Sequence, residues 1–205
     1  MMAGDYVTAG ATLAGVGLGF GLNWLRESVQ HGRRVTESKR RVASALLAEA
    51  KALRERYLEV FGSRIKQWVP GQPIELGGYV RATNLFAVYD GNTTNLGLFK
   101  QKEAEVIVRA YTLAKAHTES IGETVANVRA YMEDLRTHQA IAESTTIDHL
   151  FEPGGREHQA VTSALKKQLR EYIDNAGSLL QRESERVLSA GAEAIKVLEG
   201  YANIE

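Results

Sequence analysis

The feature that most constrains the fold is a run of twenty consecutive residues without a charged side chain, Tyr6 to Leu25. At ~1.5 Å per residue, a helix of this length matches the ~30 Å hydrocarbon core of a bilayer. Tyr6 and Trp24 lie at its two ends, where aromatic rings favour the headgroup layer. The run predicts an N-terminal transmembrane anchor over residues 1–25.

The charges on either side of this run predict its orientation. Only Asp5 is charged before it, whereas basic residues outnumber acidic ones over residues 26–41. Such an excess of positive charge is typical of the cytoplasmic side of a membrane helix. We therefore expect a protein of the bacterial inner membrane with its N-terminus outside and its C-terminal body in the cytoplasm. The residues expected at the membrane surface are Trp24, Arg33, Arg34, Lys39, Arg40 and Arg41.

Two other readings of the uncharged run stay open. A cleaved signal peptide needs a basic leader and small residues at the cleavage site, and the run here is instead followed by Arg26. A helix buried inside a water-soluble body is the second alternative, because five glycines, Thr8, Thr12 and Asn23 lower the hydrophobicity of the segment.

Glycine spacing inside the run predicts helix packing. Gly15 and Gly19 lie four residues apart on one helical face, and Gly17 and Gly21 lie four apart on another. Missing side chains let a neighbouring backbone approach closely, which favours association of membrane helices. Partners would be other copies of the chain or subunits of a membrane complex. The alternative is that these small residues only occupy an undemanding anchor.

The remainder of the chain predicts an all-α body. Its three prolines fall at Pro70, Pro73 and Pro153, and apolar residues elsewhere recur at intervals of three and four. Long helices are expected from the anchor to Trp68, over 100–144 and over 156–198. We expect a cytoplasmic antiparallel bundle of three or four helices over 42–205, following the basic segment 26–41 and interrupted by an irregular insertion at 69–99.

The segment Asn84–Phe99 has two readings. A β-hairpin could turn near Gly91, where the sequence has short-turn chemistry. Alternatively, a short helix ends near Asp90 and is followed by a loop that docks Leu96, Leu98 and Phe99 on the bundle. We favour the helix and loop, because an isolated hairpin is marginal and every other element is helical.

A motif in this segment resembles a recurrent pattern in uncharacterised bacterial single-pass membrane proteins. The motif is Tyr-Asp-x-Asn-x-x-x-Leu-Gly-Leu, carried here by Tyr89, Asp90, Asn92, Leu96, Gly97 and Leu98. The resemblance covers roughly residues 40 to 120. It implies an N-terminal membrane helix with a cytoplasmic helical region, and it implies no activity.

No pattern in the sequence predicts catalysis or a cofactor. The chain has no cysteine and a formal net charge of zero, which argues against thiolate chemistry and against a general affinity for nucleic acid. The pair Asp134 and His138 and the pair His149 and His158 fall short of the three or four convergent ligands of a metal site. No small-molecule substrate is evident either.

These observations predict a non-enzymatic scaffold, accessory subunit or adaptor held at the membrane. In this hypothesis the glycine faces contact membrane partners and the body presents a long cytoplasmic surface. The alternative is a regulatory or defence-related signalling protein of the bacterial inner membrane.

Overall fold

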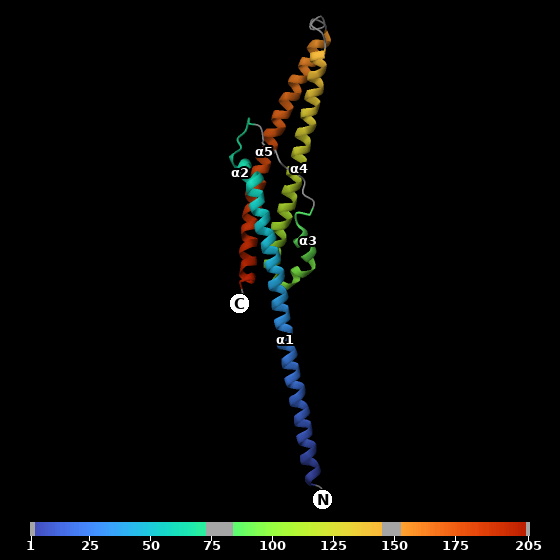
Figure 1. Cartoon of the computed structure of the whole chain (residues 1–205), viewed down its shortest axis with the longest axis vertical. Coiled ribbons are helices and arrows are strands. Elements are labelled where there is room, and N and C mark those ends of the chain that lie inside the picture. Colours follow the sequence, from blue (N-terminus) through green and yellow to red (C-terminus); the bar gives the residue numbers. More distant parts are fainter. Residues whose placement is uncertain (1–2, 73–83, 145–152, 204–205) are drawn as a thin grey trace.

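The structure confirms the all-α prediction. In the computed structural model the described residues are 3–72, 84–144 and 153–203, with side chains described at 26–27, 29–72, 84–137 and 160–203. No β-strand occurs within these ranges. The elements are α1 (Ala3–Tyr57), the π-helical η1 (Leu58–Gly62), α2 (Ser63–Gln67), α3 (Ala87–Asn92), the 3₁₀-helical η2 (Thr93–Leu98), α4 (Gln101–Ser144) and α5 (Pro153–Ala202) (Figure 1).

Helices α1 and α4 run in the same direction, which corrects the predicted antiparallel arrangement. The Tyr111 hydroxyl donates to the carbonyl of Leu46, and the side chains of His117 and Tyr57 are hydrogen-bonded. Residue numbers therefore rise together along the two helices. Figure 1 shows both helices ascending and α5 descending beside them.

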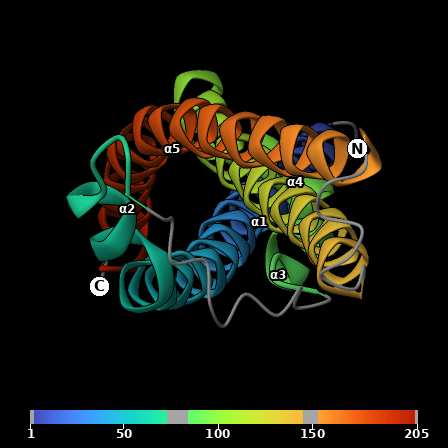
Figure 2. The ribbon, with the colours of Figure 1, turned by 90° about the horizontal axis from the view of Figure 1, so that it is seen from above.

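Helix α5 is antiparallel to both of its neighbours. Lys51 pairs with Glu199, whereas Lys66, further along the chain, accepts through its carbonyl a hydrogen bond from Gln181. Against α4, Arg109 pairs with Glu193, and His117 with Glu183. The bundle is therefore two parallel helices closed by one antiparallel helix (Figure 2).

Helices α1 and α4 are parallel because the chain runs back to the lower end of the bundle before α4 begins. Helix α2 ends at Gln67, yet Phe99 lies beside Lys39, whose ammonium is 5.5 Å from the Phe99 ring centroid. At ~1.5 Å per residue of helix, this difference in level is roughly 40 Å along the bundle axis. The predicted insertion at 69–99 thus reverses the chain along the bundle before α4 starts.

Apolar stripes predicted from the 3.6-residue period form the core, with one shift. The main cluster joins all three long helices to α3 and η2, and its buried members are Ala43, Leu46, Tyr89, Leu96, Phe99, Ile107, Tyr111 and Leu198. In α5 the spacing of three and four that joins Tyr172, Ala176 and Leu179 predicts Leu179 on the buried face. In the structure Leu179 is 45% exposed, whereas Leu180 is 1% exposed. The stripe prediction is wrong there by one residue.

The short helix favoured over a β-hairpin in residues 84–99 is confirmed, whereas the segment predicted as a loop is a 3₁₀ helix. Helix α3 covers Ala87–Asn92 and the 3₁₀ helix η2 follows directly, with Leu96 and Phe99 buried against the bundle and Leu98 half-buried. The carboxylate of Glu49 in α1 accepts hydrogen bonds from the backbone N–H groups of Val88 and Tyr89 at 2.7 and 3.0 Å. Helix α1 therefore holds the start of α3.

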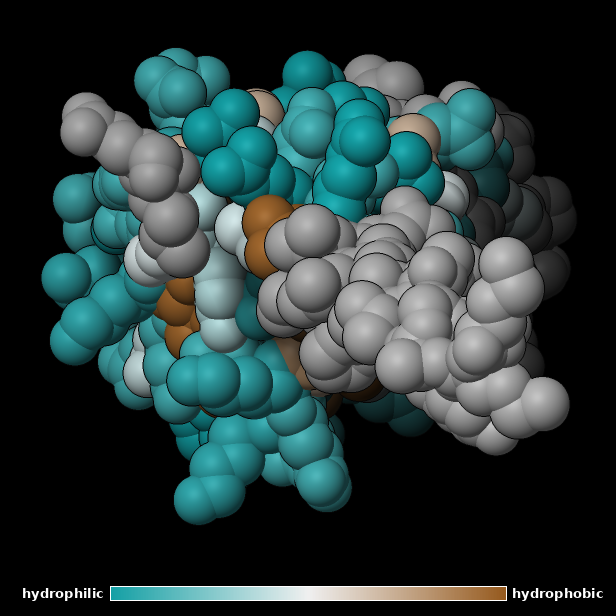
Figure 3. All heavy atoms as spheres, turned by 90° about the horizontal axis from the view of Figure 1, so that it is seen from below, coloured by the Kyte–Doolittle hydropathy of each residue, from teal (hydrophilic) through white to brown (hydrophobic). Residues whose placement is uncertain are grey.

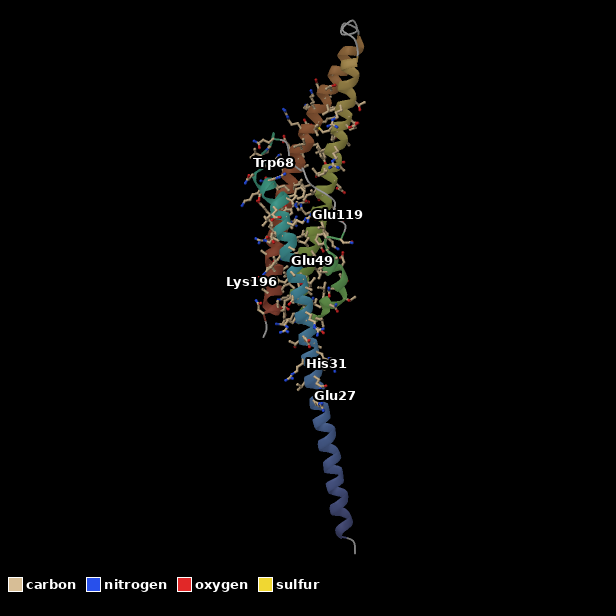
Figure 4. The ribbon with its side chains drawn as sticks, viewed as in Figure 1. Glu27, His31, Glu49, Trp68, Glu119 and Lys196 are labelled. Atoms are coloured by element: carbon tan, nitrogen blue, oxygen red, sulfur yellow. The ribbon has the colours of Figure 1, made fainter. Side chains whose placement is uncertain are left out.

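The first part of α1 extends beyond the bundle as a single helix. Residues 26–27 and 29–38 are exposed, and packing on other elements begins near Lys39 and Ala43. Glu27 and His31 lie clear of the bundle, whereas Glu49 lies within it (Figure 4). The projecting part of α1, residues 3–38, is called the arm below.

No helix in the described part of the chain is both long enough and apolar enough to cross a bilayer. The predicted transmembrane anchor over residues 1–25 is therefore not supported, although these residues from Ala3 onward are helical. The glycines together with Thr8, Thr12 and Asn23 are the residues that lower the apolar character of this segment.

Candidate functional site

A largely apolar cavity of about 160 Å³ lies between α1, α4 and α5. Helix α1 contributes residues from Ala50 to Tyr57, and η1 contributes Val60 and Phe61. Helix α4 contributes residues from Ala110 to Ile121 and α5 residues from Val187 to Ala194, while Leu85 and Phe86 line one side. The cavity lies beside three buried clusters of the bundle. Tyr111 belongs to the first, Phe61 and Ile121 to the second, and Ala110 and Ala194 to the third. It is the candidate ligand site of the described structure.

The cavity wall continues from α1 into the π-helical turn that follows it. Residues Leu58–Gly62 form η1, and both Val60 and Phe61 in this turn line the cavity. A π turn inserts one extra residue into a helix, which re-aims the following side chains, and such turns often occur at functional sites. At Gly62 an added Cβ would lie 3.0 Å from side-chain atoms of Tyr57 and Leu58, so the turn is closely packed.

A buried hydrogen-bonded chain crosses the bundle at the cavity wall. His117 is 3% exposed, with Nε2 2.9 Å from the Tyr57 hydroxyl and Nδ1 3.1 Å from a Glu183 carboxylate oxygen. An ionised carboxylate only accepts, so Nδ1 carries the proton and donates to Glu183, while Nε2 accepts from Tyr57. The Ser184 hydroxyl, also buried, hydrogen-bonds to Tyr57.

Burial keeps this chain uncharged at His117 and Tyr57. Desolvation lowers the pKa of His117, and the hydrogen bond and charge of Glu183 oppose that shift only in part. Desolvation likewise raises the pKa of Tyr57. A neutral imidazole whose two nitrogens both have partners is suited to fixing the register of three helices. Because the Nε2 lone pair already accepts from Tyr57, the imidazole is not available to act as a base.

Two arginines stand at the opening of the cavity. Arg54 and Arg56 line it, and both are exposed. Within the described part of the chain neither forms an ion pair with a carboxylate. The site therefore combines an apolar interior with two uncompensated positive charges at its edge.

The residues predicted to pack or touch a membrane do not meet at this cavity. Gly15, Gly17, Gly19 and Gly21 are helical in the arm, and their surroundings, like the Trp24 side chain, lie outside the described side chains. Arg33 and Arg34 are exposed on the arm.

The other residues predicted at the membrane surface take part in contacts near the base of the arm. The Lys39 ammonium lies 3.9 Å from the centroid of the Tyr201 ring, and Arg41 pairs with Glu37. Arg40 is exposed beside them. Lys39 therefore packs on the bundle through its ammonium group, a contact that was not predicted from the sequence.

The loop motif is a structural element at the bundle surface. Tyr89 stacks on Tyr111 with ring centroids 4.1 Å apart, and Asp90 pairs with Lys115. Asn92 donates to the Val88 carbonyl at 2.8 Å. Gly97 is exposed and Leu98 half-buried. These contacts attach α3 and η2 to the long helices and bring no further chemistry.

His117 and Ser184 were not among the functional residues predicted from the sequence. His117 follows Ala110 and Ala114 and precedes Ile121 at intervals of four, three and four, so its position on the apolar face of α4 was readable. Ser184 lies on the buried face of α5 with Leu180, one residue away from the face that the apolar spacing predicted. Polar residues on an apolar face are the signal that could have identified this network.

Metal ligands do not cluster in the described part of the chain: no group of three or more His, Asp or Glu side chains there could hold a metal ion. The side chains of His138, His149 and His158, which the sequence analysis weighed, lie outside the described ones.

Comparison with protein-family models, with curated proteins and with solved structures finds no match for this chain.

Proposed function

We propose that the protein is a non-enzymatic scaffold or adaptor whose bundle holds out the arm to bind partner helices. The observation that carries this proposal is the continuity of α1, which runs without interruption from Ala3 to Tyr57 while only its last third, from Lys39 onward, packs in the bundle. At ~1.5 Å per residue the arm reaches roughly 50 Å from the bundle.

The composition of the arm argues for a partner. Glycine in a helix costs about 1 kcal/mol relative to alanine, and Gly10, Gly15, Gly17, Gly19 and Gly21 all fall in this one segment. A helix on its own in water is only marginally stable, and in proteins most of the stability of a helix comes from packing on another element. The two glycine pairs at i, i+4 give a partner helix two faces for close approach, which would supply that packing.

The partner helices in this proposal are those of a membrane complex. The arm from Tyr6 to Leu25 has no charge, and the exposed Arg33 and Arg34 follow it at the distance where acidic headgroups would lie. The arm would enter the bilayer packed against its partners, with the bundle on the cytoplasmic face of the bacterial inner membrane.

Crosslinking in intact cells, followed by fractionation and mass spectrometry, tests the proposal. We expect the full chain in the membrane fraction, crosslinked through the arm to another copy or to another membrane protein. The double variant Gly15→Leu/Gly19→Leu should lose the crosslink while keeping its membrane association, because leucine fills the packing face and raises hydrophobicity. Val16→Leu, between these faces, is the matched control. Recovery of the wild-type chain as a soluble, uncrosslinked monomer would overturn the proposal.

A further inference from the structure

We propose that the cavity between α1, α4 and α5 binds a small apolar carboxylic acid, with its hydrocarbon body inside the bundle and its carboxylate at one of the two exposed arginines of the lining, Arg54 or Arg56. This inference is independent of the proposed role of the arm, because it rests only on residues of the bundle.

Gly191, a half-buried residue of the lining, leaves open space at the cavity. Gly191 lies between Val187 and Ala194 on the inward face of α5, where the next inward residue is the buried Leu198. A Cβ added at Gly191 would meet no atom within 4 Å. The missing side chain at Gly191 therefore adds to the space of the cavity.

The size of the cavity sets the size of the ligand body. Its volume is about 160 Å³. As a reference for size, an engineered and fully enclosed apolar cavity of ~150 Å³ binds benzene. The present cavity differs in that exposed residues, Arg54 and Arg56, form part of its lining. A hydrocarbon body of about six to eight carbons is therefore the matching class, and its burial supplies the main part of the binding free energy.

The polar groups of the wall indicate that the carboxylate of the ligand would lie at the exposed arginines and not in the inner part of the cavity. Both nitrogens of His117 and the hydrogen of Tyr57 are already used within the buried chain, and the Tyr111 hydroxyl donates to Leu46. The inner wall therefore offers no free donor to an anion. Arg54 and Arg56 each offer donors in the charged fork geometry that binds carboxylates. Because residues two apart on a helix do not face each other, one arginine at a time would bind the carboxylate. Because both are exposed, we expect them to give selectivity more than affinity.

Isothermal titration calorimetry of the full chain with octanoate, and with 1-octanol as the neutral probe of equal length, tests the site. We expect saturable one-to-one binding of octanoate. Gly191→Leu should abolish it, because the new side chain occupies the vacancy. Gly200→Leu is the matched control in the same helix: Gly200 is also free of neighbours within 4 Å but lies outside the cavity lining, so binding should be unchanged.

The double variant Arg54→Gln/Arg56→Gln tests the position of the head group. We expect octanoate to bind about tenfold more weakly, with the binding of 1-octanol unaffected. Absence of saturable octanoate binding to the wild-type chain overturns the proposal. Unchanged binding to the Gly191 variant also overturns it, because the ligand would then lie elsewhere. Equal effects of the arginine variant on both probes would overturn the assignment of the acid group.

Discussion

The indole of Trp68 lies directly on Gly177, and this contact attaches the end of the first helical segment to α5. A Cβ added at Gly177 would lie 2.6 Å from atoms of the Trp68 ring. Beside it, the Asp174 carboxylate accepts from the backbone N–H of Gly71 at 2.7 Å, and Gln181 donates to the Lys66 carbonyl at 3.2 Å. One face of α5 thus holds the turn after α2 (Figure 4).

Substituting this glycine should destabilise the protein even though alanine is the better helix former. Gly177→Ala gains about 1 kcal/mol of helix propensity, but displacing a buried indole costs about 1–3 kcal/mol as overpacking. We expect a net loss of up to about 2 kcal/mol in the free energy of unfolding, measured by chemical denaturation. Gly200→Ala, where the methyl group meets no neighbour, is the control and should be neutral or stabilising. Stabilisation by both variants would contradict the Trp68 contact.

Much of the fold was predictable because long helices carry strong periodic signals. The bounds expected for the second long helix, 100–144, agree with the observed Gln101–Ser144. The third helix starts before its expected first residue and begins at Pro153. Proline fits the first turn of a helix because an N–H group at that position has no acceptor within the helix, so its absence costs no hydrogen bond.

Helix direction and face were less predictable. Periodicity reports an apolar face but not the element that covers it, so the reversal of the chain before α4 was invisible in the sequence. In α5 the buried face shifts from Leu179 to Leu180 near Gly177, where α5 contacts Trp68 in addition to α4. The cavity was unpredictable for a related reason: Gly191 reads only as a small residue until the surrounding packing is known.

The stability of the bundle should fall in mild acid because of His117. Burial holds its folded-state pKa below the ordinary value of 6.5, so the unfolded chain binds the extra proton first as pH falls. The stabilisation is fully present above pH 6.5 and is lost as pH decreases below it. The groups that face the imidazole are Tyr57, Glu183 and, through Tyr57, Ser184.

Chemical denaturation at pH 7.5 and pH 5.5 measures this dependence. The contribution of one histidine is at most about 1.4 kcal/mol per pH unit. His117→Gln should have lower stability at pH 7.5 and a shallower decline towards pH 5.5, because the titrating group is absent. His31→Gln, on the exposed arm, should decline as the wild type does. An unchanged decline in the His117 variant would exclude His117 as its source.

Removing the Glu49 carboxylate should loosen α3 selectively. Its two oxygens accept from successive backbone N–H groups, those of Val88 and Tyr89, which otherwise have no helical partner. Glu49→Ala should accelerate hydrogen exchange at these amides and lower the free energy of unfolding by about 1–2 kcal/mol. Glu49→Gln, which keeps one acceptor, should be intermediate. Exchange that accelerates equally throughout α4 and α5 would show a general rather than a local role.

The basic residues at the base of the arm should separate into two roles. The Lys39 ammonium lies over Tyr201 and Phe99, and cation–π contacts of this kind contribute about 0.5–2 kcal/mol. Arg33 and Arg34 are exposed and free to meet acidic headgroups, each worth about 1 kcal/mol near such a surface. Seen from below, the described surface of the molecule is mostly hydrophilic, with small hydrophobic areas (Figure 3).

Lys39→Met should therefore lower the stability of the bundle and leave binding to acidic vesicles nearly unchanged. Arg33→Gln/Arg34→Gln should do the reverse, weakening sedimentation with vesicles that contain phosphatidylglycerol by about tenfold or more while the free energy of unfolding stays within ~0.5 kcal/mol of wild type. High salt should reduce the vesicle binding of the wild type in the same way. Loss of vesicle binding in the Lys39 variant alone would instead place that ammonium at the membrane surface and contradict its assignment to the bundle.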